Sequence, residues 1–469
     1  MQLKIVLILF SIILLFSTIA PAFSSNVVDD NSWTLKTPMQ QNRGALGAVA
    51  TNGKIYAIGG AINCVYNTPS STWEIVGTNE EYDPILDNWT TKASMPTARA
   101  YFAIAAFQNK VYCFGGLVGT GLFPYQNTDI LLPGAKWCNT TEVYDPATNL
   151  WETKSPMPIT QGIQFTATTM GDRIFLFGGV GAQPVMVYDP TTDQWDTPLN
   201  NSTNITQSWT KAVIDAYISA GLSTGDSQYT STHFNENIYV LSRSLFASGT
   251  RALFIYNTAN QSWTLGKTVT SETRGITAIA TNGSIAPVRL YFITSTTNNI
   301  YNPKDDTWQI GKPMQIIRFD FAIAAINDKI FVIGGYSSDD LISGMMINEE
   351  YTPMGFGTIE PTISDISLER ITNNELSLNF IVDRPVNWVG YSLDGKANVT
   401  ISGNATITGL EPGTHNITIF VRDTYENFGA SKIIEFQVAA EPFSPMIMVT
   451  IIIIATICLA LVLYFWRKK

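Results

Sequence analysis

Among the residue types that commonly act in catalysis or bind metals, histidine is the rarest in this chain of 469 residues, which has only His233 and His415. His233 lies in the repeated part of the sequence, whereas His415 lies in the segment 359–440, which is expected to be a separate domain. A radical copper site needs two histidine ligands beside a Tyr–Cys crosslink, and a zinc site needs clustered cysteines or histidines. Neither spacing is present, so the sequence predicts no metal, no cofactor and no histidine-based catalytic triad.

Arginine, in contrast, recurs at a fixed place. Arg43, Arg99 and Arg318 each stand sixteen residues before the first glycine of a Gly-Gly pair. Gly162 has this place in the third unit, and Arg274 takes it in the fifth once a four-residue insertion at SIAPVR is allowed for. If the units close into a ring, the four arginines face one mouth of its channel, where guanidinium groups could hold carboxylates. The alternative is structural: the same arginines would tie backbone carbonyls and neighbouring acids together.

The elements that position these arginines repeat six times. Five of six repeated tyrosines are followed seven residues later by a tryptophan. An apolar run such as KIYAIGG or KVYCFGG precedes each tyrosine phrase, and four of the six runs end in a glycine pair. The tyrosines are Tyr82, Tyr144, Tyr188, Tyr256, Tyr301 and Tyr351, and the tryptophans are Trp89, Trp151, Trp195, Trp263 and Trp308. Each unit of about fifty residues holds four short apolar or alternating runs separated by turn residues, which predicts four strands per unit.

These phrases resemble the kelch repeat over roughly residues 32–354. The resemblance implies an all-β fold, a six-bladed β-propeller over residues 26–354. In the kelch family, arginines at the start of the innermost strand can bind acidic peptides or carboxylates, so the resemblance extends this role to Arg43, Arg99, Arg274 and Arg318. The family also includes enzymes, so a carbohydrate-active enzyme of the sugar epimerase or mutarotase kind, with its site in the channel, is the alternative.

Two unmatched aromatic residues predict how the ring closes. Tyr351 has no tryptophan after it, and Trp33 has no tyrosine before it. Residues 32–36 are therefore expected to be the fourth strand of the last blade.

The repeat ends near Thr358, and residues 359–440 contain further short strand-like runs such as ELSLNFIVD and HNITIFVRD. The phrase GLEPGT at 409–414 resembles the late strands of fibronectin-like or immunoglobulin-like sandwiches, although His415 and Asn416 stand where a tyrosine is common. We expect a small β-sandwich domain.

The two ends are apolar in different ways. Residues 1–25 have one basic residue, a short apolar core and an Ala-Pro-Ala exit, which predicts a signal peptide; an uncleaved anchor is the alternative. Residues 445–466 carry no charge and precede Arg467-Lys468-Lys469, which predicts a transmembrane helix with a cytoplasmic tail at 467–469. A glycolipid-anchor signal is the minor alternative. The expected location is the cell membrane, with a single pass and an extracellular ectodomain.

The ectodomain is acidic. Once Lys4 and the three terminal cations are set aside, 24 basic residues face 38 acidic ones, a net charge of −14. This charge disfavours nucleic acid as a partner. Together these features predict a binding protein that contacts an extracellular protein, peptide or glycan.

Cysteine and asparagine provide the remaining candidate sites. Cys64 and Cys138 fall in equivalent loops of adjacent units and are expected to form a disulfide, with Cys113 buried and free. Ten Asn-x-Ser/Thr sequons are candidate glycosylation sites. They are Asn88, Asn139, Asn200, Asn201, Asn204, Asn260, Asn282, Asn398, Asn404 and Asn416.

Overall fold

The computed structural model describes residues 29–62, 74–119, 135–158, 165–178, 185–196, 229–242, 250–270, 276–337, 344–439 and 445–467. Its contacts divide the chain into two compact units. One unit covers Val28–Ile359, and the other consists of Met1–Val27 together with Glu360–Lys469.

The unit Val28–Ile359 is built from six four-stranded antiparallel sheets, numbered 1 to 6 along the chain. Sheets 1 to 3 contain β2 (Gly47–Thr51), β3 (Lys54–Ile58), β4 (Asn79–Asp83) and β5 (Asn88–Lys92); β6 (Ala103–Phe107), β7 (Lys110–Gly119), β8 (Ala135–Asp145) and β9 (Leu150–Lys154); and β10 (Thr166–Met170), β11 (Arg173–Phe177), β12 (Met186–Asp189) and β13 (Gln194–Asp196). Sheets 4 and 5 contain β14 (Tyr229–Phe234), β15 (Asn237–Ser242), β17 (Leu253–Asn257) and β18 (Ser262–Leu265); and β20 (Thr277–Ala280), β21 (Leu290–Ile293), β22 (Asn298–Asn302) and β23 (Thr307–Gly311). Sheet 6 contains β24 (Ala322–Ile326), β25 (Lys329–Ile333), β26 (Asn348–Thr352) and β1 (Ser32–Lys36), and a small extra sheet pairs β16 (Thr250–Arg251) with β19 (Val269–Thr270).

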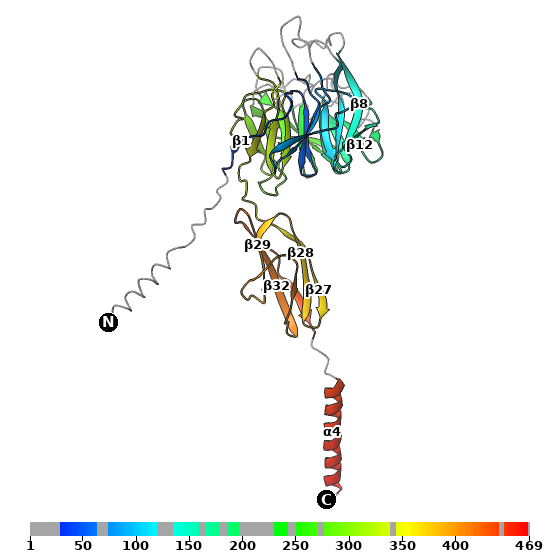
Figure 1. Cartoon of the computed structure of the whole chain (residues 1–469). Helices are drawn as coiled ribbons and strands as arrows, with labels where there is room; N and C mark the ends of the chain where they lie inside the picture. The colour runs from blue at the N-terminus through cyan, green and yellow to red at the C-terminus, as the bar shows by residue number, and fades with distance from the viewer. Residues whose placement is uncertain are drawn as a thin grey trace, which may run out of the picture. The chain divides into compact units, whose positions relative to one another are not determined.

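The six sheets form a closed ring. The inner strands contact one another in the order β2, β6, β10, β14, β20, β24 and back to β2, and Figure 1 shows the sheets set side by side around a common centre. Six hydrophobic clusters fill the spaces between neighbouring sheets, each drawing side chains from two of them. Both faces of each sheet are therefore buried, which explains the near-continuous apolar runs.

Sheet 6 is completed by the beginning of the described chain. β1 pairs with β26, and Trp33 lies opposite Tyr351 in the register. Their ring centroids are 4.9 Å apart, and only 7% of the surface of Trp33 is exposed. The first and last strands of the unit thus belong to one sheet.

The tyrosine and tryptophan of the repeat take part in a recurring clamp between sheets. In sheet 1, the Tyr82 hydroxyl donates to Asp87 Oδ1 at 2.6 Å, and the same oxygen accepts the backbone N–H of Thr37 at 3.0 Å. The indole of Trp89 donates to the carbonyl of Thr37 at 2.8 Å. Sheet 4 differs, because Gln261 stands where sheet 1 has Asp87.

The same contacts are made in four other sheets. The equivalent acceptors are Asn149, Asp193, Asp306 and Asn31, and the equivalent indoles are Trp151, Trp195, Trp308 and Trp33. In sheets 1, 2, 3 and 5 the clamp fixes the segment that enters the sheet to the turn between its third and fourth strands, and in sheet 6 Asn31, just before β1, takes the place of that turn.

The second unit contains two sheets around one core. The first consists of β27 (Ile363–Thr372), β28 (Glu375–Val382) and β31 (Ala405–Ile407). The second consists of β30 (Val399–Ile401), β29 (Val386–Leu393), β32 (Gly413–Asp423) and β33 (Phe428–Ala430), with β34 (Ile434–Val438) also paired to β32. Leu378, Ile407, Ile417 and Ile419 are among the side chains of the shared core.

One helix follows. Helix α4 runs over Pro445–Trp466, and its segment Val449–Trp466 is long and apolar enough to cross a membrane.

Candidate functional site

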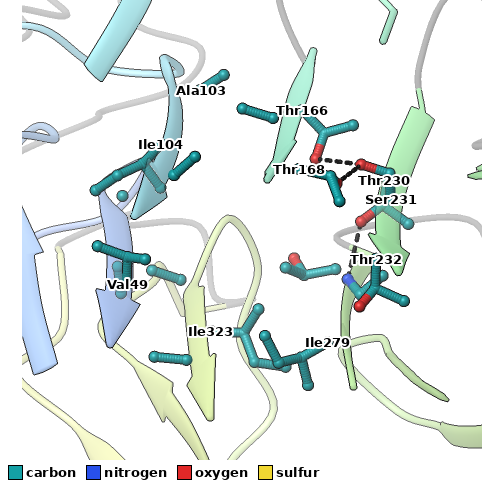
Figure 2. Close-up of a pocket in the computed structure, with 18 of the residues that line it drawn as sticks. Val49, Ala103, Ile104, Thr166, Thr168, Thr230, Ser231, Thr232, Ile279 and Ile323 are labelled. Carbon is teal, nitrogen blue, oxygen red and sulfur yellow. Dashed lines mark hydrogen bonds between the residues drawn. The ribbon is translucent and has the colours of Figure 1, made fainter. Parts of the chain in front are cut away.

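A cavity of about 380 Å³ lies at the centre of the ring. Its walls are formed by the six inner strands β2, β6, β10, β14, β20 and β24 together with the residues just before them. Figure 2 shows these strands around the open space. No single sheet builds this site, because every sheet contributes one strand.

The wall of the cavity has two chemically different sides. Strands β2, β6, β20 and β24 contribute mostly alanine, valine and isoleucine, as at Val49, Ile104 and Ile323. Strands β10 and β14 contribute a group of hydroxyls, called here the hydroxyl wall, and Figure 2 places them on one side of the space. Its members are Thr166, Thr168, Thr230, Ser231 and Thr232.

The hydroxyl wall is held together across two sheets. Ser231 Oγ is in hydrogen-bond contact with the hydroxyl of Thr168, and it lies 3.2 Å from the hydroxyl of Thr166. Thr230 Oγ1 accepts the backbone N–H of Ala278 at 2.8 Å, which joins sheets 4 and 5. The hydroxyls therefore bridge inner strands, and they also give this side of the cavity hydrogen-bonding capacity that the alanine-rich strands lack.

One end of the cavity carries an acid–phenol pair on unusual backbone. The Tyr101 hydroxyl donates to Asp320 Oδ2 at 2.8 Å. Ala45, Tyr101 and Asp320 all adopt a left-handed backbone, with φ of 52°, 53° and 52°. Backbone hydrogen bonds link the three residues in a chain, from Ala45 N to Asp320 O at 2.8 Å and from Tyr101 N to Ala45 O at 2.9 Å. Such conformations are costly for residues other than glycine, and they are often found at functional positions.

The arginines predicted to line the mouth are buried instead. Arg43, Arg99 and Arg318 each have 0% exposed surface. Arg43 pairs with Glu80, and it donates to the carbonyls of Gly59 at 2.8 Å and Thr78 at 2.9 Å. Arg99 makes the same bond to Gly115 at 3.0 Å, so in these two units the spacing of sixteen residues brings the arginine to its glycine pair.

Arg99 and Arg318 are each paired with a glutamate in the same way. Arg99 pairs with Glu142 at 2.7 Å, and Arg318 pairs with Glu349. Burial lowers the pKa of Arg43 and of Arg318, and the neighbouring glutamates oppose that shift. These three side chains are inaccessible to a ligand, which corrects the expectation of an arginine ring at the mouth and supports the structural alternative. Arg274 lies outside the described residues.

The cysteines are only partly described. Cys113 is buried and free, and burial raises the pKa of its thiol to about 12. Cys138 is also free and partly exposed. Cys64 lies outside the described residues, so its pairing with Cys138 stays a prediction.

The sequons differ in how they present their amide. Six of them are exposed: Asn88, Asn260, Asn282, Asn398, Asn404 and Asn416. Asn139 is partly buried, and its Nδ2, the atom that a glycan would occupy, donates to the carbonyl of Met157 at 3.0 Å. Asn200, Asn201 and Asn204 lie outside the described residues.

The two histidines are in different units. His233 lies on β14 and lines the cavity, whereas His415 lies on β32 of the second unit. Within the described part of the chain, no group of three or more His, Cys, Asp or Glu side chains could hold a metal ion.

Sequence reasoning missed the hydroxyl wall and the Tyr101–Asp320 pair. A signal for the hydroxyl wall was present, because TATTM at 166–170 and YTSTHF at 229–234 stand where other units have AIAAF or AIAAI. Tyr101 and Asp320 stand at one repeat position, two residues after Arg99 and Arg318, but the residue type at this position differs from unit to unit, so the repeat does not predict their contact.

Comparison with known proteins gives a partial match. The kelch motif matches residues 42–96 and 98–158, so the chain carries kelch repeats. Beta-scruin of Limulus polyphemus is 27% identical over 152 residues, which are 32% of this chain and 15% of that protein. The influenza virus NS1A-binding protein homolog of Mus musculus is 40% identical over 83 residues, which are 18% of this chain and 12% of that protein. The chain thus spans less than a fifth of either relative. A solved structure described as "Structure of YjhT" is 13% identical with a TM-score of 0.46, over 67% of this chain and 95% of that one.

Proposed function

We propose that this kelch-repeat chain is a membrane-anchored extracellular binding protein. In this proposal the six sheets are the blades of a six-bladed propeller, and they contact a glycan, a peptide or another surface protein through the central cavity and its rim. The second unit is an immunoglobulin-like or fibronectin-like stalk. The apolar helix α4, followed by Arg467, supports a single membrane pass with the C-terminus in the cytoplasm.

The distribution of acid and base groups in the cavity supports binding over catalysis. Asp320 is the one carboxylate and His233 the one imidazole among the described lining residues. His233 of β14 and Ala325 of β24 occupy equivalent places in their sheets. Each pairs with the second residue of the neighbouring strand, Ile238 in β15 or Ile330 in β25. Asp320 therefore stands five residues further along the channel, or about 16 Å at the usual rise per residue. General acid–base pairs need groups within hydrogen-bond reach of one substrate atom or a bridging water, so this pair cannot act together on one bond.

The relatives agree with an interaction role. One of them is named for binding influenza virus NS1A. A ring of six short strands around a two-sided cavity also has the features of a small-molecule or peptide site, which are a mostly apolar wall and a few placed polar groups.

A carbohydrate-active enzyme is the second candidate. The observation that favours it is the left-handed backbone at Tyr101 and Asp320, since strained residues beside an acid recur at catalytic sites. In this alternative Asp320 would exchange a proton with a sugar, and Asp320→Asn would abolish turnover while leaving the fold intact.

The experiment is a binding screen followed by wall variants. The soluble ectodomain, residues 26–440, is applied to glycan and protein arrays, and each hit is titrated. Thr168→Val and Ser231→Ala remove hydroxyls at nearly constant volume, and Thr34→Val on the outer strand β1 is the matched control. Binding through the cavity predicts at least tenfold weaker affinity for the two wall variants and no change for the control. Unchanged affinity in all three would remove the cavity from the proposal, and conversion of a sugar in the screen would favour the enzyme.

A further inference from the structure

The second unit places two aromatic side chains next to each other on one sheet, an exposed phenylalanine and a partly exposed tryptophan. Trp388 on β29 lies opposite Arg422 on β32, and Arg422 lies opposite Phe428 on β33. The two aromatic rings are 6.5 Å apart, and the Arg422 guanidinium lies 5.8 Å from the Phe428 ring centre. Phe428 is 57% exposed. These three residues are called the Trp388 platform.

The indole of Trp388 lies flat on its own sheet. A Cβ on Gly390 would come within 2.6 Å of Trp388 Cζ2, so the ring covers the backbone at this glycine. The indole N–H donates to Thr400 Oγ1 on the neighbouring strand β30 at 3.1 Å. One face of the ring therefore rests on β29, and the other face points away from the sheet.

Thr400 is the third residue of the sequon Asn398-Val399-Thr400. Asn398 directly precedes the first residue of β30, Val399, and alternation continued from the strand would put its side chain on the side that carries the indole. The Asn398 side chain is thus about 7 Å along the strand from the hydroxyl that Trp388 binds. Asn398 is exposed, as an acceptor must be.

The chemistry of the platform suits an uncharged sugar. Arg422 is paired with Glu426 at 3.1 Å, so the platform presents little net charge to a ligand. The indole offers a broad planar surface, and the C–H face of a pyranose ring can pack on such a surface while its hydroxyls stay in water. An exposed aromatic patch of this kind normally has a partner that covers it.

We propose that Asn398 carries an N-linked glycan whose first N-acetylglucosamine packs on the Trp388 platform. The glycan is then a structural part of the second unit, because it covers the aromatic pair and ties β30 to β29. This proposal rests on the extracellular location proposed above.

The test uses the full chain produced in a eukaryotic secretory host. Peptide mass spectrometry measures the occupancy of each sequon, and hydroxyl-radical footprinting measures the labelling of Trp388 and Phe428. Labelling is compared for the intact glycoprotein, for protein trimmed to one N-acetylglucosamine and for protein with its glycans removed enzymatically. Asn398→Gln and Asn416→Gln are compared in the same way. Asn416 lies on β32 opposite Glu435, so its glycan is the matched control.

The proposal predicts occupied Asn398 and low labelling of Trp388 in both the intact and the trimmed protein. Complete removal, or Asn398→Gln, should raise Trp388 labelling several-fold, whereas Asn416→Gln should leave it unchanged. Equal labelling with and without the glycan, whether high or low, would overturn the proposal, and low labelling in both would assign the platform to another partner. An empty Asn398 beside other occupied sequons would also overturn it. A chain with no occupied sequon would instead refute the extracellular location, and the glycan proposal would fall with it.

Discussion

Removing the side chain of Trp33 should weaken the whole ring. Trp33 is 7% exposed, packs with Tyr351 at 4.9 Å between ring centres, and donates its indole N–H to Lys312 O at 2.8 Å. Truncating a buried tryptophan to alanine costs about 3–5 kcal/mol, most of it lost burial and the cavity left behind. Domains are commonly stable by only about 5–15 kcal/mol, so Trp33→Ala should remove a large share of the stability of the ring.

The assay is calorimetric melting of the soluble ectodomain, residues 26–440. A loss of this size should lower the Tm of the ring by about 4–7 °C. Leu35→Ala on the same strand is the control, because Leu35 is 55% exposed and its truncation should change the stability by less than about 0.5 kcal/mol. Deleting residues 26–37 should be at least as damaging as Trp33→Ala, since it also removes the five-residue ladder to β26. A deletion variant that melts with the parent would refute the reasoning that the N-terminal strand closes the ring.

Three other outcomes are expected. Arg43→Met should cost about 3–5 kcal/mol in urea unfolding, because it leaves the buried Glu80 carboxylate without its cationic partner, and adding Glu80→Met should restore much of the loss. His415 contacts the carbonyl of Glu411 and the carboxylate of Asp394, and these contacts raise the pKa of its imidazole. The contribution of His415 to stability is therefore present below pH 6.5 and is lost as the pH rises through the raised pKa. The variant His415→Gln should flatten this part of the plot of stability against pH. The Cys113 thiol, with its pKa near 12, should react with iodoacetamide at pH 8 only after unfolding, and rapid labelling of the native protein would contradict its burial.

The repeated phrases carried most of the information about the ring. The tyrosine–tryptophan spacing of seven residues places the two rings opposite each other across a tight turn, as Tyr82 and Trp89 show in the register. Closure could be predicted for the same reason, since Trp33 and Tyr351 lacked partners of their own. The sequence repeat predicts these tyrosine–tryptophan pairs, because each tyrosine and each tryptophan occupies a fixed place in a four-stranded unit.

The fate of the arginines could not be predicted from their spacing alone. The position of the arginines in the repeat places them near the axis of the ring. Whether an arginine side chain is exposed depends on whether the third strand of its sheet supplies a carboxylate to pair with it. A clue was available: Glu80 stands two residues before its tyrosine, and the equivalent residues are Glu142 and Glu349 beside the other described arginines. The third unit has Gly162 in place of the arginine and Met186 in place of the glutamate. The contact of Tyr101 with Asp320 joins two residues at the same repeat position, but their types differ between units, so coordinates are needed to find it.

Because β1 pairs with β26, the first strand of the ring cannot be paired until the last strand has been synthesised. Asn31 and Tyr351, which hydrogen-bond in the finished ring, are 320 residues apart in the chain. At about 5–20 residues per second, the ribosome needs roughly 15–60 s to make the partner after the first strand has emerged. During that time β1 is an unpaired edge with an uncovered tryptophan, the kind of segment that pairs wrongly with other chains. The protein therefore depends on its cell to keep the first strand unpaired until the last one arrives, and slow translation late in the message should raise the fraction that aggregates.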